Sequence, residues 1–238
     1  MTERVSTGIE GLDNLIAGGL PRGRSVLVAG EPGTGKTTLC LQFLMEGLRR
    51  GESVIYVGID EKPMHIIQDA LGLEWKFQPY LDSGKFQILD VSDYFSVLKP
   101  DNKEAGKDLN VMINDLKDFI AKAGATRVAI DPIAPLIFNR QNLPEIDAYM
   151  RALVFALEES QAITTLLTSH VPVGTAALSQ HGIEEFIVSG IVTLRLIKLT
   201  NKYVRTLLVR KMRGSFTELT EYSFDILSGR GVVLRQPI

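Results

Sequence analysis

The sequence contains a single cysteine, Cys40, among its 238 residues. One cysteine excludes an internal disulfide and favours a reducing compartment, where thiols stay free. Long apolar runs are also missing: no stretch approaches the roughly eighteen consecutive apolar residues that a membrane-spanning helix needs. No apolar run follows Thr2, Glu3 and Arg4, so we expect no signal peptide at the start of the chain. These absences predict a cytoplasmic protein that does not contact a membrane.

An excess of charge of one sign is absent as well. The chain has 26 Lys and Arg against 28 Asp and Glu, which gives a net charge of −2. This balance argues against wholesale electrostatic attraction to nucleic acid or to an anionic membrane. The three histidines, His65, His170 and His181, lack metal-ligand spacing and have no cysteine partners. With 45% apolar residues and no linker-like tract, residues 1–238 are expected to form one globular domain.

What the sequence does contain is a glycine-rich loop between an apolar strand candidate, Ser25–Ala29, and a helix candidate, Leu39–Leu48. The loop fits G-x-x-x-x-G-K-[ST] and reads Gly30-Glu31-Pro32-Gly33-Thr34-Gly35-Lys36-Thr37-Thr38. Its glycines allow a tight turn in which successive N–H groups point at phosphate oxygens. Lys36 is expected to reach the β- and γ-phosphates, and the Thr37 hydroxyl is expected to bind magnesium. The alternative, a glycine-rich turn without a ligand, does not require the strand and the helix found on its two sides.

Strand and helix candidates alternate as far as Val171, which is typical of a doubly wound parallel sheet. Helix candidates run over Pro63–Leu71, from a capping Asp108 to Gly124, and onward from Pro144. The strand candidates in this part are Ser25–Ala29, Ser53–Gly58, Phe86–Val91, Arg127–Asp131 and Ile163–Ser169.

Beyond Val171 the pattern changes, because four strand candidates follow with little helix between them. Thr200-Asn201-Lys202 fits a hairpin turn between the first two. These strand candidates are Phe186–Ile197, Tyr203–Met212, Leu219–Ile226 and Gly231–Leu234. The sequence therefore predicts an α/β fold with a mostly parallel central sheet flanked by helices and an antiparallel C-terminal extension.

Carboxylates and hydroxyls follow several strands of this predicted sheet. Asp131 ends an apolar strand as a Walker B aspartate does, and is expected to hold magnesium through its water shell. The alternative is a turn cap, since Pro132 follows. Asp60 and Glu61 follow the strand that we expect beside the loop strand, and one of them, Glu61 ahead of Asp60, is the predicted general base. A solvated turn is the alternative. Thr168 is a further candidate for contact with the γ-phosphate.

Residues 186–217 contain no Asp or Glu but many basic residues. Lys211 and Arg213 are two apart, so on a strand they project to one side and could grip the γ-phosphate of a neighbouring subunit. The basic residues are Arg195, Lys198, Lys202, Arg205, Arg210, Lys211 and Arg213. A stripe that binds nucleic acid and a solvated hairpin face are alternative interpretations. Only Tyr203 and Phe216 supply aromatic rings, which weakens the nucleic-acid interpretation.

Together these segments resemble a known family. The resemblance rests on an N-terminal block, 6–13, a turn-rich connector, 18–23, the phosphate loop, and Lys211-Met212-Arg213-Gly214, at their spacing in the chain. In these features the sequence resembles a single KaiC-type ATPase domain, a branch of the RecA superfamily, over essentially its whole length.

The resemblance implies a RecA-like P-loop NTPase fold that binds ATP or ADP with Mg²⁺. It also implies a homo-oligomeric ring, usually a hexamer, with nucleotides at the subunit interfaces. Lys36 and Thr37 would contact phosphate and magnesium, with Asp131 at the Walker B position. The pair Lys211 and Arg213 would act in trans on the next subunit.

The sequence departs from the pattern of this family at three positions: Pro132 stands where a small hydroxyl residue often follows the aspartate, Thr217 stands where a histidine often follows the KMRG turn, and Asp60 differs in the catalytic pair. Asp60 and Glu61 occupy the place of the catalytic Glu-Glu pair. Because Asp60 replaces the first glutamate, Glu61 is left as the expected base.

The predicted function is a magnesium-dependent ATPase that works as a regulatory switch with a protein signalling partner. Two alternatives remain open at this point. One is a RecA- or RadB-like protein in which ATP controls DNA binding. The other is an autokinase or protein kinase, in which a protein hydroxyl takes the place of water.

Overall fold

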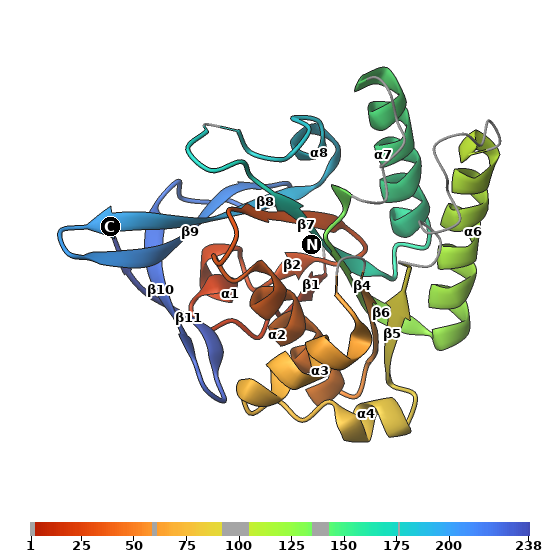
Figure 1. The fold of residues 1–238 in the computed structure, drawn as a ribbon, viewed down its shortest axis with the longest axis horizontal. Coiled ribbons are helices and arrows are strands. Elements are labelled where there is room, and N and C mark those ends of the chain that lie inside the picture. The colour runs from red at the N-terminus through yellow and green to blue at the C-terminus, as the bar shows by residue number, and fades with distance from the viewer. Residues whose placement is uncertain (1–2, 59–60, 92–104, 135–142, 176) are drawn as a thin grey trace.

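The computed structural model describes residues 3–58, 61–91, 105–134, 143–175 and 177–238. Among these residues, nine strands form one sheet in the order β11-β10-β9-β8-β3-β7-β6-β4-β5 (Figure 1). A small second sheet pairs β1 (Arg4–Val5) with β2 (Leu20–Pro21). No helix within the described ranges is long and apolar enough to cross a membrane.

The central strands run parallel, as expected for the alternating part of the chain. They are β5 (Phe86–Asp90), β4 (Ser53–Gly58), β6 (Ala125–Asp131), β7 (Thr164–His170), β3 (Ser25–Gly30) and β8 (Gly190–Leu199). Each remaining strand pairs antiparallel to its neighbour: β9 (Lys202–Met212), β10 (Glu221–Leu227) and β11 (Gly231–Pro237). The α/β fold with an antiparallel C-terminal extension is thus confirmed.

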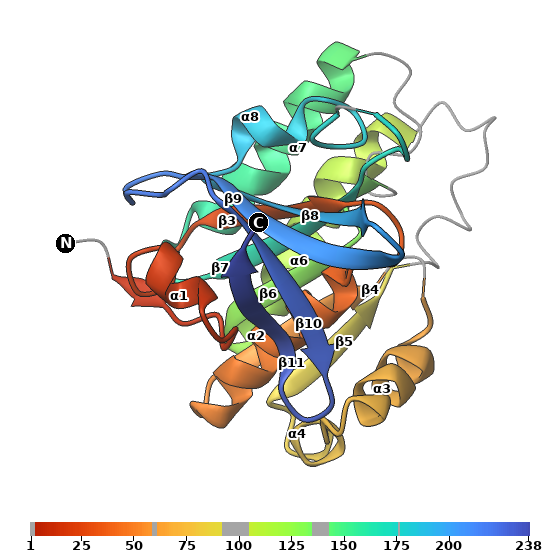
Figure 2. The same cartoon turned by 90° about the vertical axis from the view of Figure 1, so that its left-hand side faces the viewer.

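Helices cover both faces of the sheet (Figure 2). One face carries α2 (Lys36–Arg49), α3 (Pro63–Gly72) and α4 (Gln78–Asp82), and the other carries α6 (Ala105–Ala123) and α7 (Leu143–Glu158). Two short helices, α1 (Leu12–Leu15) and α8 (Glu184–Ile187), lie in connecting segments.

Alternation along β3 shows why the parallel strands are apolar throughout. Val26 and Val28 pack into the core beside α2, whereas Leu27 and Ala29 pack into the core beneath α6 and α7. All four are completely buried. A strand covered on both faces needs apolar side chains at every position, which removes the alternation typical of exposed sheets.

Several predicted boundaries differ from the structure. The helix after the phosphate loop begins at Lys36 and not at Leu39, because its first turn carries the polar end of the loop. α6 begins at Ala105, so Asp108 lies inside the helix and not at its N-terminal cap position. The strand predicted from Phe186 begins at Gly190, since α8 occupies the residues before it. β8 itself is parallel to β3, and the antiparallel extension starts with β9.

The position predicted for the strand before Asp60 and Glu61 was wrong. β4 is not beside the loop strand β3, because β7 and β6 lie between them. Apolar patterning indicates that a strand is buried, but it does not encode which strand lies next to it. Asp60 itself lies outside the described residues, and Glu61 is exposed just beyond the end of β4.

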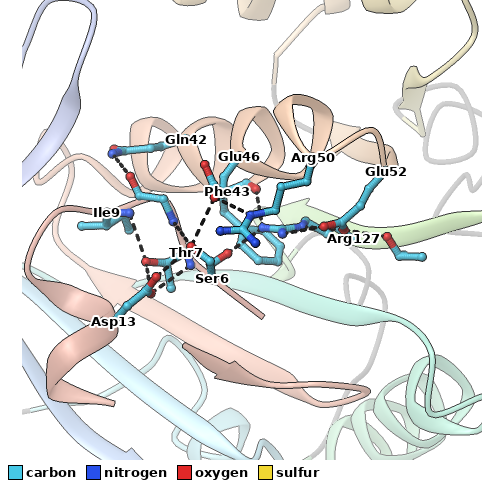
Figure 3. A network of polar contacts seen from close by, with 12 residues as sticks. Ser6, Thr7, Ile9, Asp13, Gln42, Phe43, Glu46, Arg50, Glu52 and Arg127 are labelled. Atoms are coloured by element: carbon cyan, nitrogen blue, oxygen red, sulfur yellow. Dashed lines mark hydrogen bonds and ion pairs between the residues drawn. The ribbon is translucent and has the colours of Figure 1, made fainter. Parts of the chain in front are cut away.

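A buried arginine ties the N-terminal block to the base of α2 (Figure 3). Arg127 of β6 is 1% exposed and forms an ion pair with Glu52 at 2.7 Å. Its guanidinium donates to the carbonyls of Ser6 at 2.7 Å and Phe43 at 3.1 Å, and lies 4.8 Å from the centre of the Phe43 ring. Burial by itself raises the pKa of Glu52. Hydrogen bonds from Arg127 and Thr126 together have a larger, opposite effect, so the pKa lies below its usual range.

Replacing Arg127 with alanine is expected to lower the free energy of unfolding by about 3 kcal/mol, because Glu52 and two buried carbonyls lose their donor. Urea unfolding followed by circular dichroism measures this loss. Arg50→Ala is the control: Arg50 is exposed and pairs with Glu46 within one helix, so its loss should cost about 0.5 kcal/mol or less. Equal losses for the two variants would contradict the structural role of Arg127.

Candidate functional site

The phosphate loop joins β3 to α2 with a backbone that only glycine adopts readily. Gly33 and Gly35 have φ angles of 78° and 103°. A Cβ atom at Gly30 would lie 2.5 Å from the Leu194 carbonyl oxygen on β8, so no side chain fits there. The Thr34 hydroxyl donates to the Glu31 carbonyl at 2.8 Å and closes the turn. The loop therefore leads directly into the N-terminus of a 14-residue helix, where N–H groups favour an anion.

Lys36 lies folded along this loop. Its Nζ donates to the carbonyls of Gly30 at 2.9 Å and Glu31 at 3.0 Å. Burial lowers the pKa of Lys36, and the Asp131 carboxylate opposes that effect. The ammonium thus lies at the level of the phosphate loop, held by two carbonyls that a more negative acceptor could replace. Thr37 follows it in the first turn of α2 and is half-buried.

Asp131 at the end of β6 is fixed by two hydroxyl donors. The Tyr56 hydroxyl donates to its Oδ2 at 2.9 Å, and the Thr168 hydroxyl donates to its Oδ1. Burial raises the pKa of Tyr56 far above its usual value, and the neighbouring carboxylate adds to this effect, so the phenol keeps its proton. Nothing in the sequence indicated Tyr56, because it lies within an apolar strand. Its hydroxyl meets Asp131 only when β4 pairs with β6.

The donor set at this edge fits a magnesium ion bound together with phosphate. A carboxylate offers about four lone pairs, so Asp131 can accept further hydrogen bonds from metal-bound water. Mg²⁺ is usually held by one or two protein oxygens plus waters and substrate phosphates. Consistent with this, the described residues contain no cluster of three or more His, Cys, Asp or Glu suited to a metal ion. Asp131 and Thr37 supply oxygens of the kind that magnesium prefers.

The carboxyl ends of the parallel strands bring most predicted site residues to one edge of the sheet. Gly58 of β4 is level with Asp131, and Gly30 of β3 is level with His170 of β7. Glu61 follows the end of β4 on this edge, two strands further from the phosphate loop than expected. Thr168 is completely buried beneath Asp131, so its hydroxyl holds the carboxylate in place; its predicted contact with the γ-phosphate remains a prediction.

Lys211 and Arg213 are not on this edge. The Arg213 N–H donates to the Ser189 carbonyl, and the Ser189 N–H donates to the Ser25 carbonyl at the start of β3. Arg213 is therefore level with Ser25, and five residues of extended strand, about 16 Å, separate that level from Gly30. Lys211 is level with Leu27 in the middle of β3, and its ammonium is held by the carbonyls of Glu185 and Val188, so neither side chain contacts the phosphate loop of its own chain.

The rest of the basic segment follows the hairpin of β8 and β9. The Arg205 Nε donates to the Gly33 carbonyl at 3.2 Å, so the C-terminal extension supports the phosphate loop directly. Nothing in the sequence indicated this contact, because it joins residues far apart in the chain. Four other basic residues of the hairpin are exposed: Arg195, Lys198, Lys202 and Arg210.

The chain is similar to known proteins over nearly its whole length. The profile of a protein family described as an ATPase, KaiC, matches residues 5–237. The chain is 33% identical to the UPF0273 protein PH0284 of Pyrococcus horikoshii, over 98% of this chain and 94% of that protein. It is 34% identical to the circadian clock oscillator protein KaiC of Thermosynechococcus vestitus, over 95% of this chain but only 43% of that protein. The crystal structure of the KaiC-like protein PH0186 from Pyrococcus horikoshii superposes with a TM-score of 0.85 at 30% identity, over 99% of this chain and 100% of that one.

Proposed function

The chain belongs to the KaiC ATPase family of the RecA superfamily, and from that premise we propose that it hydrolyses ATP with Mg²⁺ at sites shared between subunits of a ring. One observation carries the proposal: the phosphate loop follows the carboxyl end of β3, whereas Arg213 is level with the amino end of β3 and the Lys211 ammonium is held by the carbonyls of Glu185 and Val188. A site that needs both must draw them from two copies of the chain. Head-to-tail contacts of this kind form a ring when the rotation from each copy to the next closes on itself.

In this proposal each side chain has a defined task. Lys36 would bind the β- and γ-phosphates, and Thr37 and Asp131 would hold the metal, Asp131 through the water shell of the ion. Magnesium supplies neutralisation of charge on the phosphate oxygens. Glu61 accepts a proton from water as the water oxygen attacks the γ-phosphorus and the bond to the ADP oxygen breaks. Lys211 and Arg213 of the adjacent copy stabilise the charge on the transferred group.

Replacing Glu61 with glutamine tests the hydrolytic function. The amide keeps the shape but cannot accept the proton, so phosphate release should fall about 10²- to 10⁴-fold while the affinity for Mg-ATP stays the same. Steady-state phosphate release and calorimetry measure the two quantities. The control is Asp69→Asn, at an exposed acid of α3, which should leave both unchanged. Turnover that survives Glu61→Gln would remove Glu61 as the base, and a wild-type protein without turnover would remove the ATPase proposal.

ATP-controlled DNA binding is a second candidate, favoured by the four exposed basic residues of the β8–β9 hairpin. It predicts that single-stranded DNA binds with Mg-ATP and that added salt weakens binding steeply. Fluorescence anisotropy with a labelled oligonucleotide measures this. No binding at low salt would eliminate this candidate and leave a protein partner for the proposed regulatory switch.

A further inference from the structure

Glu184 is a completely buried carboxylate with no part in the nucleotide chemistry described above. It begins α8 and accepts hydrogen bonds from the hydroxyls of Ser169 at 3.2 Å and Ser179 at 2.7 Å. The N–H groups of His181 and Ile183 also donate to it, at 3.3 Å and 3.2 Å. Burial raises the pKa of Glu184, but hydrogen bonds from its own N–H, the Ser179 hydroxyl and the Ile183 N–H, together with the nearby His181, outweigh that effect and keep the pKa below its usual range. The side chain is therefore an ionised group that fixes a short segment in one place.

On one side, Glu184 is bound to the carboxyl end of β7. We call the carboxyl ends of the parallel strands, where the phosphate loop lies, the nucleotide edge of the sheet. Ser169, which donates to it, is the next residue after Thr168 on β7, and Thr168 holds the carboxylate of Asp131. Ser169 is also level with Ala29 of β3, one residue before the phosphate loop. A shift of the end of β7 at the nucleotide would therefore move the donor to which Glu184 is bound.

On the other side, the segment that Glu184 begins holds Lys211. The Lys211 Nζ donates to the carbonyls of Glu185 at 3.0 Å and Val188 at 2.8 Å, which belong to α8 and the residue after it. α8 lies beside α7 in both views (Figure 1, Figure 2). Because α8 has four residues and little helical stability of its own, tertiary contacts such as those of Glu184 must fix its carbonyls.

We propose that Glu184 is a positioning residue for Lys211, and that it connects the nucleotide edge of one subunit to the lysine offered to the next subunit's site. The inference rests on the proposed function, in which Lys211 acts on a neighbour's γ-phosphate. In the ring, a shift of the end of β7 then moves α8 through Glu184. The carbonyls of Glu185 and Val188 move with it and orient the Lys211 ammonium.

Replacing Glu184 with glutamine tests the first part of the inference. Turnover should fall roughly 10- to 100-fold because a displacement of about 1 Å at a reacting group has an effect of that size. The affinity of the variant's own phosphate loop for Mg-ATP should be unchanged. Glu218→Gln, at an exposed glutamate, is the matched control and should retain wild-type turnover.

Mixed rings separate action through Lys211 from a merely structural defect. A Glu184→Gln chain next to a Lys36→Ala chain offers an intact phosphate loop to an intact Lys211, so equimolar mixing should restore about a quarter of wild-type turnover. A Glu184→Gln chain mixed with an Arg213→Ala chain should restore none, since both lesions lie on the same side of the interface. If Glu184→Gln does not fold, Ser179→Ala removes one donor to the carboxylate and should give the same pattern.

The mixtures also distinguish failure of this inference from failure of the proposed function. Arg213→Ala with Lys36→Ala tests the shared site alone, without Glu184. If that pair regains activity but Glu184→Gln with Lys36→Ala does not, Glu184 acts within its own site and the inference is overturned. If neither pair regains activity, sites are not shared, and the proposed ring mechanism and the inference both fail.

Discussion

Replacing Lys36 with alanine is expected to weaken Mg-ATP binding by roughly 30- to 4,000-fold and to abolish turnover. The range corresponds to about 2–5 kcal/mol, the usual cost of removing one member of a buried, hydrogen-bonded charge pair. Lys36 is 6% exposed, and its ammonium donates hydrogen bonds to the carbonyls of Gly30 and Glu31. A triphosphate that enters the loop presents negatively charged oxygens to the Lys36 ammonium. Alanine cannot pair with these oxygens.

Calorimetry with Mg-ATP and Mg-ADP measures this loss of affinity. Lys85→Ala is the matched control, because the Lys85 Nζ is exposed and donates to the Gly51 carbonyl at the far end of β4. That variant should bind nucleotide as tightly as the wild type. If Lys36→Ala and wild type bind with the same Kd, then the loop does not cradle a triphosphate, and the function proposed here loses its basis.

Replacing Arg213 with alanine is expected to lower kcat by about 10³- to 10⁵-fold, the range found for arginine fingers. Binding to the chain's own phosphate loop should not change, because Arg213 is level with the start of β3 and about 16 Å of strand separates it from Gly30. Arg210→Ala is the control, since Arg210 lies on β9 just before Arg213, is exposed and takes no part in the proposed hydrolysis. It should retain wild-type turnover.

Complementation and particle mass complete this test. Equimolar Arg213→Ala and Lys36→Ala chains should regain about a quarter of wild-type turnover, since one interface in about four then combines two intact halves. Light scattering with and without Mg-ATP should show a particle larger than one chain whenever turnover is present. A monomer that hydrolyses ATP at the wild-type rate would contradict a role for Arg213 in trans.

The local parts of the site could be predicted from the sequence because each depends on residues close together in the chain. The phosphate loop needs glycines at fixed positions between a strand and a helix, and all of these lie within residues 25–49. The end of β6 at Asp131 was predicted in the same way, from an apolar run that stops at a carboxylate. Burial on both faces gives such strands a composition that can be read without knowing their neighbours.

Contacts between distant segments could not be predicted. Tyr56 and Asp131 are 75 residues apart, and Arg127 and Ser6 are 121 apart, yet each pair is joined by a hydrogen bond. The order of strands also depends on contacts between distant segments, and for this reason β4 was wrongly expected beside β3. Apolar patterning is satisfied by many strand orders, whereas hydrogen bonding of buried polar groups is satisfied only in the one that forms.

By itself, then, the sequence predicted the chemistry that we propose for this protein: a loop of main-chain amides and a lysine for phosphate, and oxygen ligands for magnesium. Only the tertiary structure decided that Arg213 is level with the amino end of β3, away from that loop, and that α8 is bound to Ser169 through Glu184 and to the Lys211 ammonium through the Glu185 carbonyl. The reason is physical. Backbone geometry and burial are set over a few neighbouring residues, whereas the distance between two side chains depends on how the whole sheet is assembled.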